Sequence, residues 1–234
     1  MTRLLLVRHA ETGGNAERLI QGQHDHPLSE RGREQALLLR HRLARETLHA
    51  AYSSDLGRAA DTAQLALGQR DVALSLDPAL REMDFGEWDG RSQAELRREV
   101  PELVAQRRQD PMSFVPPGGE PFRDVVQRCT RFLEQTVQRH SDESVLLVSH
   151  GGPLSIILYR LLDIPPTYPW RFRFGNASLS IVEVLPLRSG LGYDSAEAGD
   201  DSKQTTRSSL MLFNDTCHWS MAEAGQRAAA RRLP

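Results

Sequence analysis

The chain has 234 residues, with 29 Lys and Arg against 31 Asp and Glu, so its formal net charge is −2. This length can bury a full hydrophobic core, and we expect one domain over residues 1–220 followed by a flexible tail over 221–234. The balanced charge excludes a global basic field of the kind that binds nucleic acid or anionic membranes, so no such partner is expected.

Cysteine content and hydropathy point to a location in the cell. Two distant cysteines, Cys129 and Cys217, are interpreted as packed thiols in a reducing compartment. The apolar run at residues 4–7 is too short for a signal-peptide core, and no stretch approaches the ~20 apolar residues of a membrane span. We therefore expect a cytoplasmic protein, either a monomer or a homodimer.

The N-terminal half predicts strands that alternate with helices. Residues 4–7 form a continuous apolar run, which is typical of a strand buried on both faces. The pattern then predicts a helix capped by Ser29, a strand over 50–53, a helix from Asp55 with Arg58 in its first turn, and a strand over 72–76 that ends before Pro78.

The C-terminal half continues this alternation after a polar interruption. Residues 91–117 are helical in propensity but highly charged and broken at Pro101, and we interpret them as a cover over a site. Next come an amphipathic helix over 122–137, a strand over 144–149, a helix from Gly151 to Leu162, and strands over 179–184 and 210–213. Residues 186–209 are rich in Gly, Ser and Asp and are predicted to form a mobile loop.

These elements predict an α/β fold, a three-layer sandwich in which helices flank a mostly parallel central sheet. Ligands bind such sheets at the carboxyl ends of the strands. Arg8 and His9 directly follow the first buried strand, and His150 follows a strand of similar sequence. Two histidines are therefore expected at one edge of the sheet.

This edge could carry the chemistry of phosphate monoester cleavage, which needs positive charge, an in-line nucleophile and a proton for the leaving oxygen. Arg8 and Arg58 can hold phosphate oxygens with planar guanidinium groups, and the helix opening at Gly151 adds backbone N–H donors. These charges can replace a divalent metal, so neither a metal nor a cofactor is expected.

The nucleophile and the proton donor can also be assigned from the sequence. Nearby cations favour the neutral, nucleophilic form of His9, so His9 is the predicted nucleophile and His150 the electrostatic partner of the phosphoryl group. Glu82, near the end of the third strand, is the predicted proton donor and base.

Several motifs resemble those of the histidine phosphatase superfamily, which includes cofactor-dependent phosphoglycerate mutases. The segment 6–12 reads Leu-Val-Arg-His-Ala-Glu-Thr, and further segments similar to the family, in family order, lie at 27–36, 53–59, 80–82, 117–120, 148–152 and 214–218. The resemblance implies a phosphoglycerate mutase-like fold, phosphorylation of His9, and further phosphate contacts from Asn15, Gln21 and Gly22.

Two positions depart from the family pattern. Ala10 stands where the family usually has Gly, and its methyl group is expected to narrow the pocket floor slightly. Gly14 stands where an aromatic residue is frequent, and it leaves more room in the loop that carries Asn15.

The resemblance leaves the reaction open between hydrolysis and phosphoryl transfer. The segment 83–90 resembles the phosphatase branch and places carboxylates beside Glu82, and the cover is shorter than a mutase insertion. We therefore predict a phosphatase acting on a small phosphorylated metabolite. Phosphoglycerate mutase activity is the runner-up, and a non-catalytic phosphate-binding module is a remote alternative.

Three other groups of residues have weaker interpretations. The segment His24-Asp25-His26 could be a metal site, but its two alternating histidines lack a third ligand at a recognised spacing. This loop is therefore interpreted as a rim of the pocket. The arginine pairs at 97–98 and 107–108 could contact an acidic substrate or form a solvated helix face. The aromatic residues of 170–174 are predicted to form an edge strand or a loop packed on the core: Trp170, Phe172 and Phe174.

Overall fold

The computed structural model describes residues 1–165, 172–186 and 206–221. Six strands form one sheet in the order β3-β2-β4-β1-β5-β6. Their bounds are β1 (Thr2–Arg8), β2 (Ala50–Ser53), β3 (Leu74–Leu76), β4 (Ser144–Ser149), β5 (Leu179–Pro186) and β6 (Thr206–Asp215). The first four strands pair in parallel, whereas β5 is antiparallel to both of its neighbours, so the prediction of a mostly parallel sheet is confirmed.

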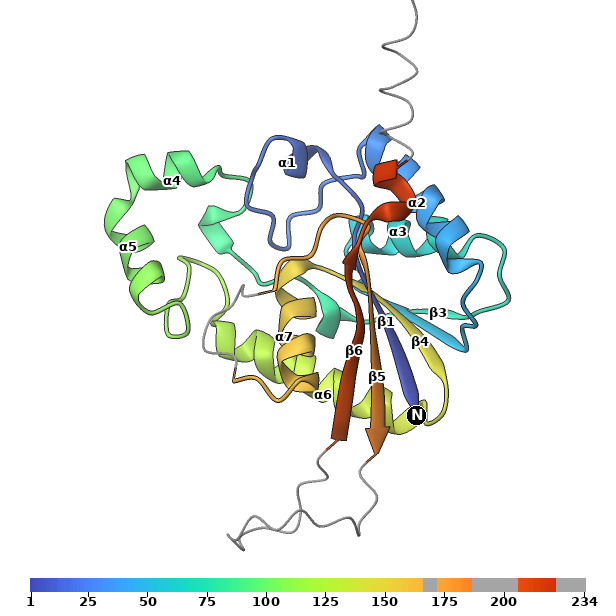
Figure 1. Ribbon diagram of the computed structural model, residues 1–234. Helices are drawn as coiled ribbons and strands as arrows, with labels where there is room; N and C mark the ends of the chain where they lie inside the picture. The colour runs from blue at the N-terminus through green and yellow to red at the C-terminus, as the bar shows by residue number, and fades with distance from the viewer. Residues whose placement is uncertain (166–171, 187–205, 222–234) are drawn as a thin grey trace, which may run out of the picture.

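Helices cover both faces of the sheet (Figure 1). The helices α2 (Glu30–Leu43) and α3 (Gly57–Leu67) pack on one face, and α6 (Phe122–Arg139) and α7 (Gly151–Leu161) pack on the other. Along β1, Leu4 and Leu6 belong to the core beneath α6 and α7, while Leu5 and Val7 belong to the core beneath α2 and α3. This two-sided burial explains the continuous apolar run, because successive side chains point to opposite faces of a strand.

Most predicted elements are present, with differences at their ends. The helix predicted from Asp55 begins at Gly57, after Leu56 at the N-cap, and keeps Arg58 in its first turn. The short helix α1 (Gly13–Ala16) was not predicted; a capping box between Thr12 and Asn15 stabilises it. Two 3₁₀ turns, η1 (Pro78–Leu80) and η2 (Gly86–Trp88), occupy the segment after β3.

The loop predicted over 186–209 is wrong at its two ends. Strand β5 continues to Pro186 and β6 begins at Thr206, and antiparallel pairing between them extends both strands. Residues 187–205, the tail from 222 onward and Trp170 lie outside the described residues.

The predicted cover forms two helices, α4 (Gln93–Glu99) and α5 (Pro101–Gln109), which lie to one side of the sheet (Figure 1). Pro101 ends the first helix and occupies the first position of the second, where its missing N–H costs no hydrogen bond. The backbone of Ile20 ties the start of the cover to the N-terminal loop, with N–O distances of 2.9 Å to Arg91 and to Gly90.

The two cysteines differ in environment. Cys129 on α6 is fully buried, and burial raises the pKa of its thiol to about 12. Cys217 is exposed, so the prediction of two packed thiols is wrong for this residue. Of the described helices, none combines the length and the apolar character needed to cross a membrane.

Candidate active site

The ends of β1 and β4 bring the two predicted histidines together. The strands pair in parallel with Arg8 opposite Ser149, and the His9 N–H donates to the Ser149 carbonyl at 2.8 Å. As a result, the imidazole rings of His9 and His150 lie 5.1 Å apart between centroids. Both side chains are buried, with exposed fractions of 3% and 0%.

The bonding of His9 fixes which ring nitrogen can react. Its Nδ1 lies 2.8 Å from the carbonyl oxygen of Ala10. Because a carbonyl can only accept, Nδ1 carries the proton and Nε2 keeps its lone pair. Burial, reinforced by the charges of Arg8 and Arg58, holds the pKa of His9 well below its usual 6.5. The ring is therefore neutral at pH 7, as the sequence predicts for a nucleophile.

His150 is held by a serine that the sequence analysis did not single out. Its Nε2 lies 2.9 Å from the hydroxyl of Ser54, which also accepts the Leu56 N–H at 3.3 Å. Burial and the neighbouring charges of Arg58, His9 and Arg8 lower the pKa of His150, so this ring is neutral too. When Ser54 donates its proton to Nε2, the proton of the ring lies on Nδ1, which is buried and has no acceptor among the described residues.

Arg58 is fully buried and Arg8 is partly buried beside the histidines. Arg8 donates to the Phe174 carbonyl at 2.7 Å, and Arg58 donates to the carbonyls of Gly22 and His24 at 2.5 and 2.9 Å. Burial lowers the pKa of each guanidinium, yet arginine stays charged in proteins.

Four buried nitrogen atoms of the predicted site have no hydrogen-bond partner among the described residues: Nε of Arg8, Nε of Arg58, Nδ1 of His150 and Nε2 of Gln21. A buried donor without an acceptor is costly, and an anion supplies several acceptors at once. This donor set therefore fits a phosphate group.

Glu82 lies at the entrance to the same cluster. Its two carboxyl oxygens accept the N–H groups of Met83 at 2.9 Å and Gly152 at 3.1 Å. A Cβ atom on Gly152 would lie 2.3 Å from a Glu82 oxygen, so this close approach requires glycine. The carboxylate also lines a cavity of about 810 Å³, together with Arg8 and Gly151.

Of the remaining predicted phosphate contacts, Gln21 lines the cavity, whereas the side-chain oxygen of Asn15 and the N–H of Gly22 are engaged elsewhere. The Asn15 side-chain oxygen closes the capping box of α1 and accepts from Asn176 at 3.0 Å. The Gly22 N–H donates to the carboxylate of Asp89 at 2.9 Å, so it is not directed at a phosphate.

The two departures from the family pattern have local explanations. Ala10 is fully buried, and it packs with Leu28, Ala36 and Ala177. The expected narrowing of the pocket floor by its methyl group stays a prediction. At Gly14 a Cβ atom would lie 2.8 Å from the Gln21 side chain, so the room that this glycine leaves is filled by Gln21.

The loop of His24, Asp25 and His26 supports Arg58. Asp25 accepts the N–H groups of Gly57 and Arg58 at 2.5 and 3.3 Å, which caps the start of α3. None of the three residues lines the cavity, which is also true of His9 and Arg58, so their interpretation as a pocket rim stays a prediction.

Sequence reasoning missed Arg128, which holds the segment that carries Glu82. From α6 its guanidinium donates to the carbonyls of Ala79, Arg81 and Glu82 at 2.8, 2.6 and 3.1 Å. It also donates to the Glu120 carboxylate at 2.8 Å. No sequence signal distinguishes Arg128 from the other charged residues of this amphipathic helix.

The residues that line the rest of the cavity include arginines of the cover and two aromatic residues, for which the sequence left alternatives open. Arg97, Arg107 and Arg108 of the cover line it, whereas Arg98 pairs with Glu99 outside it. Residues 172–174 form a loop, and Phe172 and Phe174 both pack on the core and line the cavity.

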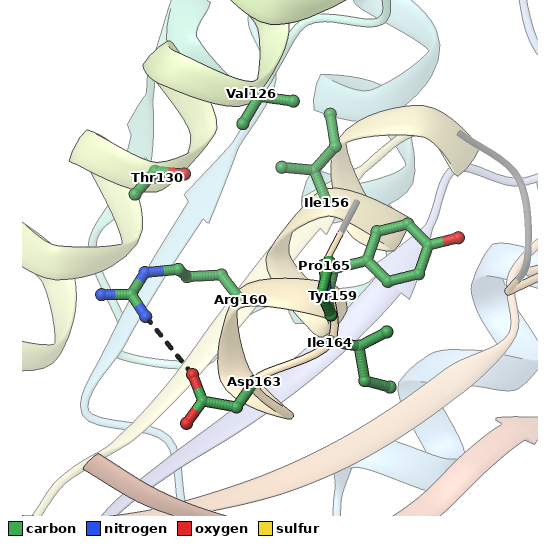
Figure 2. Close-up of a pocket in the computed structure, with 8 residues that line it drawn as sticks. All are labelled: Val126, Thr130, Ile156, Tyr159, Arg160, Asp163, Ile164 and Pro165. Carbon is green, nitrogen blue, oxygen red and sulfur yellow. Dashed lines mark ion pairs between the residues drawn. The ribbon is translucent and has the colours of Figure 1, made fainter. Parts of the chain in front are cut away.

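A second hollow of about 320 Å³ lies between α6 and α7 (Figure 2). Its charged residues, Arg160 and Asp163, pair with each other at 3.9 Å, and its other lining side chains are mostly apolar. None of the predicted site residues lines it. Arg8, Gln21, Glu82 and Gly151 line the larger cavity, whereas His9, Arg58 and His150 are buried and do not line either one.

Comparison with known proteins agrees with this geometry. The adenosylcobalamin/alpha-ribazole phosphatase of Escherichia coli strain K12 is 34% identical over 182 residues, which are 78% of this chain and 90% of that protein. The probable phosphoglycerate mutase GpmB of Yersinia enterocolitica is 34% identical over 199 residues, which are 84% of this chain and 93% of that protein.

A solved structure, Bacillus stearothermophilus YhfR, superimposes with a TM-score of 0.78 at 33% identity and covers 93% of this chain and 99% of that one. Residues 4–188 match the family model of the histidine phosphatase superfamily, branch 1. The chain therefore belongs to the histidine phosphatase superfamily.

Proposed function

We propose that this chain hydrolyses phosphate monoesters of small metabolites through a phosphohistidine at His9. The observation that carries the proposal is the bond from His9 Nδ1 to the Ala10 carbonyl, which leaves Nε2 as a nucleophile beside four unpaired donors suited to phosphate. The family membership and the phosphatase name of a relative support hydrolysis.

In the first step, Nε2 of His9 attacks phosphorus as the ester P–O bond breaks. Glu82 supplies the proton that the leaving alkoxide needs, because its carboxyl group lines the cavity together with Arg8, the residue that precedes His9. Arg8, Arg58 and His150 stabilise the charge that spreads over the equatorial oxygens of the phosphoryl group.

In the second step, water attacks the phosphohistidine and the P–N bond breaks. The Glu82 carboxylate takes a proton from that water, so the acid of the first step becomes the base of the second. Ester and water have then become alcohol and inorganic phosphate, and His9 is again neutral. Because arginine and histidine supply the positive charge, we infer that no divalent metal takes part.

The test combines substrate turnover with detection of the intermediate. The unaltered chain, assayed with excess EDTA, is expected to release phosphate from a panel of monoesters and to form an acid-labile phosphoenzyme. His9→Ala is expected to lose both signals. Persistent phosphorylation of His9→Ala, or activity that requires added Mg²⁺ or Zn²⁺, would contradict the mechanism.

Mutase activity remains the second candidate because of one observation. Arginines of the cover line the cavity, and the predicted carboxylates beside Glu82 do not line it. Asp84 accepts the Gly86 N–H, and Asp89 accepts from Gly22 and His24. A cationic cover can retain a doubly phosphorylated intermediate, which a mutase needs.

Incubation with 3-phosphoglycerate and catalytic 2,3-bisphosphoglycerate separates the two reactions, because both begin from the same phosphohistidine. We expect isomerisation to be slower than phosphate release from the best monoester of the panel. The opposite order would assign the chain as a mutase.

A further inference from the structure

Five arginines that line the cavity have no role in the proposed hydrolysis: Arg18, Arg97, Arg107, Arg108 and Arg173. Of these, Arg18 follows α1, Arg97 lies on α4 and Arg108 lies on α5. None of these three guanidinium groups forms an ion pair or hydrogen bond with another described residue. Among the described residues that line this cavity, Glu82 is the sole carboxylate. The wall therefore has an excess of positive charge over what the transferring phosphate needs.

The arginines of α4 differ in whether they line the cavity and in whether they pair with a carboxylate. Arg98, the neighbour of Arg97 in sequence, does not line the cavity and pairs with Glu99 at 2.9 Å. Arg91 pairs with the same carboxylate. Glu99 thus pairs with two arginines that do not line the cavity, and no described carboxylate pairs with Arg97.

Arg18 is held at the cavity by an unusual backbone conformation. Its φ of +59° lies in the left-handed region, which residues other than glycine rarely adopt. The next two residues pair with the start of the cover, through the bridge from Leu19 to Ser92 and the bond from Ile20 to Arg91. Such conformations concentrate where a side chain serves a site, and this pairing places Arg18 beside α4.

Resting on the proposed function, we propose that the substrate carries a second anionic group on an apolar body, and that Arg18, Arg97 and Arg108 bind this group. Guanidinium forks match both carboxylate and phosphate oxygens. Phe85, Trp88 and other apolar side chains line the same cavity and can contact the body between the two anions. A volume of about 810 Å³ also exceeds what a small monoester alone would fill.

The test uses matched esters that differ only in a second charge. The short pair is phenyl phosphate and 4-carboxyphenyl phosphate; the long pair is biphenyl-4-yl phosphate and 4′-carboxybiphenyl-4-yl phosphate. Each is assayed with the unaltered chain, with the double variant Arg97→Gln/Arg108→Gln, and with the control Arg98→Gln. Hydroquinone bisphosphate carries a phosphate in place of the carboxylate of 4-carboxyphenyl phosphate. The anion whose ester loses more kcat/KM in the double variant is the anion that the arginines prefer.

In at least one pair, the double variant is expected to lower kcat/KM about tenfold or more for the charged ester and less than about twofold for its uncharged partner. Arg98→Gln is expected to change neither. Equal losses within both pairs, or no loss, would overturn this inference alone. No hydrolysis of any ester by the unaltered chain would overturn the proposed function and this inference with it.

Discussion

The neutral state of His9 and His150 makes the stability of the fold depend on pH. Burial lowers the pKa of both rings below 6.5, so below about pH 6.5 the unfolded chain binds protons that the folded chain does not. The free energy of unfolding is therefore unaffected by these groups above pH 6.5. Below it, the free energy of unfolding falls with pH, by up to about 1.4 kcal/mol per pH unit for each histidine.

Urea unfolding between about pH 7.5 and 5 checks this prediction. His150→Asn removes one of the two titrating rings, so its stability should fall less steeply below pH 6.5 than that of the unaltered chain. Identical slopes for the two proteins would show that His150 does not remain neutral in the folded state.

The contribution of Glu82 to kcat is expected to increase with the basicity of the leaving group, because a more basic leaving oxygen depends more on protonation. Glu82→Gln keeps the size of the side chain but removes the acid, so kcat is expected to fall about 10²-fold or more for alkyl phosphates and much less for nitrophenyl phosphate. Steady-state assays over a series of leaving groups measure this. A uniform loss across the series would assign Glu82 to substrate binding or folding instead.

At the scale of single residues, the sequence predicts which side chains gather but not every bond they form. His9, His150, Arg8, Arg58 and Glu82 converge as expected, because strand ends and helix starts place them at one edge of the sheet. The N–H of Gly22, in contrast, bonds Asp89, which lies 67 residues further along the chain. Such a pairing depends on the path of two loops, which local sequence patterns do not specify.

At the scale of secondary structure, elements with strong apolar periodicity were predicted well. The helix expected over 122–137 spans Phe122–Arg139, because its apolar stripe packs on the sheet. The short helix α1 has no such stripe and depends on a capping box, so periodicity could not reveal it. The first residues of β6 are polar, and pairing with β5 rather than burial holds them in a strand.

The packing of α6 against the Glu82 segment leads to a prediction about Arg128. This side chain is about one-fifth exposed, and its guanidinium bonds three carbonyls. Arg128→Met keeps the aliphatic stem but removes these bonds, and it is expected to lower the free energy of unfolding by about 2 kcal/mol. It should also lower kcat for alkyl phosphates more than for nitrophenyl phosphate, because Glu82 loses its position.

Arg128→Lys is the matched variant, since a lysine ammonium can restore some of the carbonyl contacts. Partial recovery of kcat on alkyl phosphates is expected. Were Arg128→Met less stable yet unchanged in its dependence on the leaving group, Arg128 would stabilise the fold without positioning Glu82.

At the scale of the whole molecule, the phosphate cluster and the cover are attached to the core very differently. The cluster begins where β1 and β4 end, and these two strands pair at the centre of the sheet with fully buried side chains on both faces. The cover contributes a single buried side chain from its two helices, Leu96 on α4, and α5 contributes none.

This difference in attachment implies two separate opening equilibria. Amides of β1 and β4 can exchange with solvent only when the sheet itself opens, whereas α5 can detach at a much smaller free-energy cost. Hydrogen exchange followed by mass spectrometry should therefore label 101–109 long before 2–8 and 144–149. In that case the cover can open and let a product leave while the phosphate cluster stays assembled. Activity is then expected to persist until the whole chain unfolds. Equal protection of the three segments would mean that cover and sheet open as one unit.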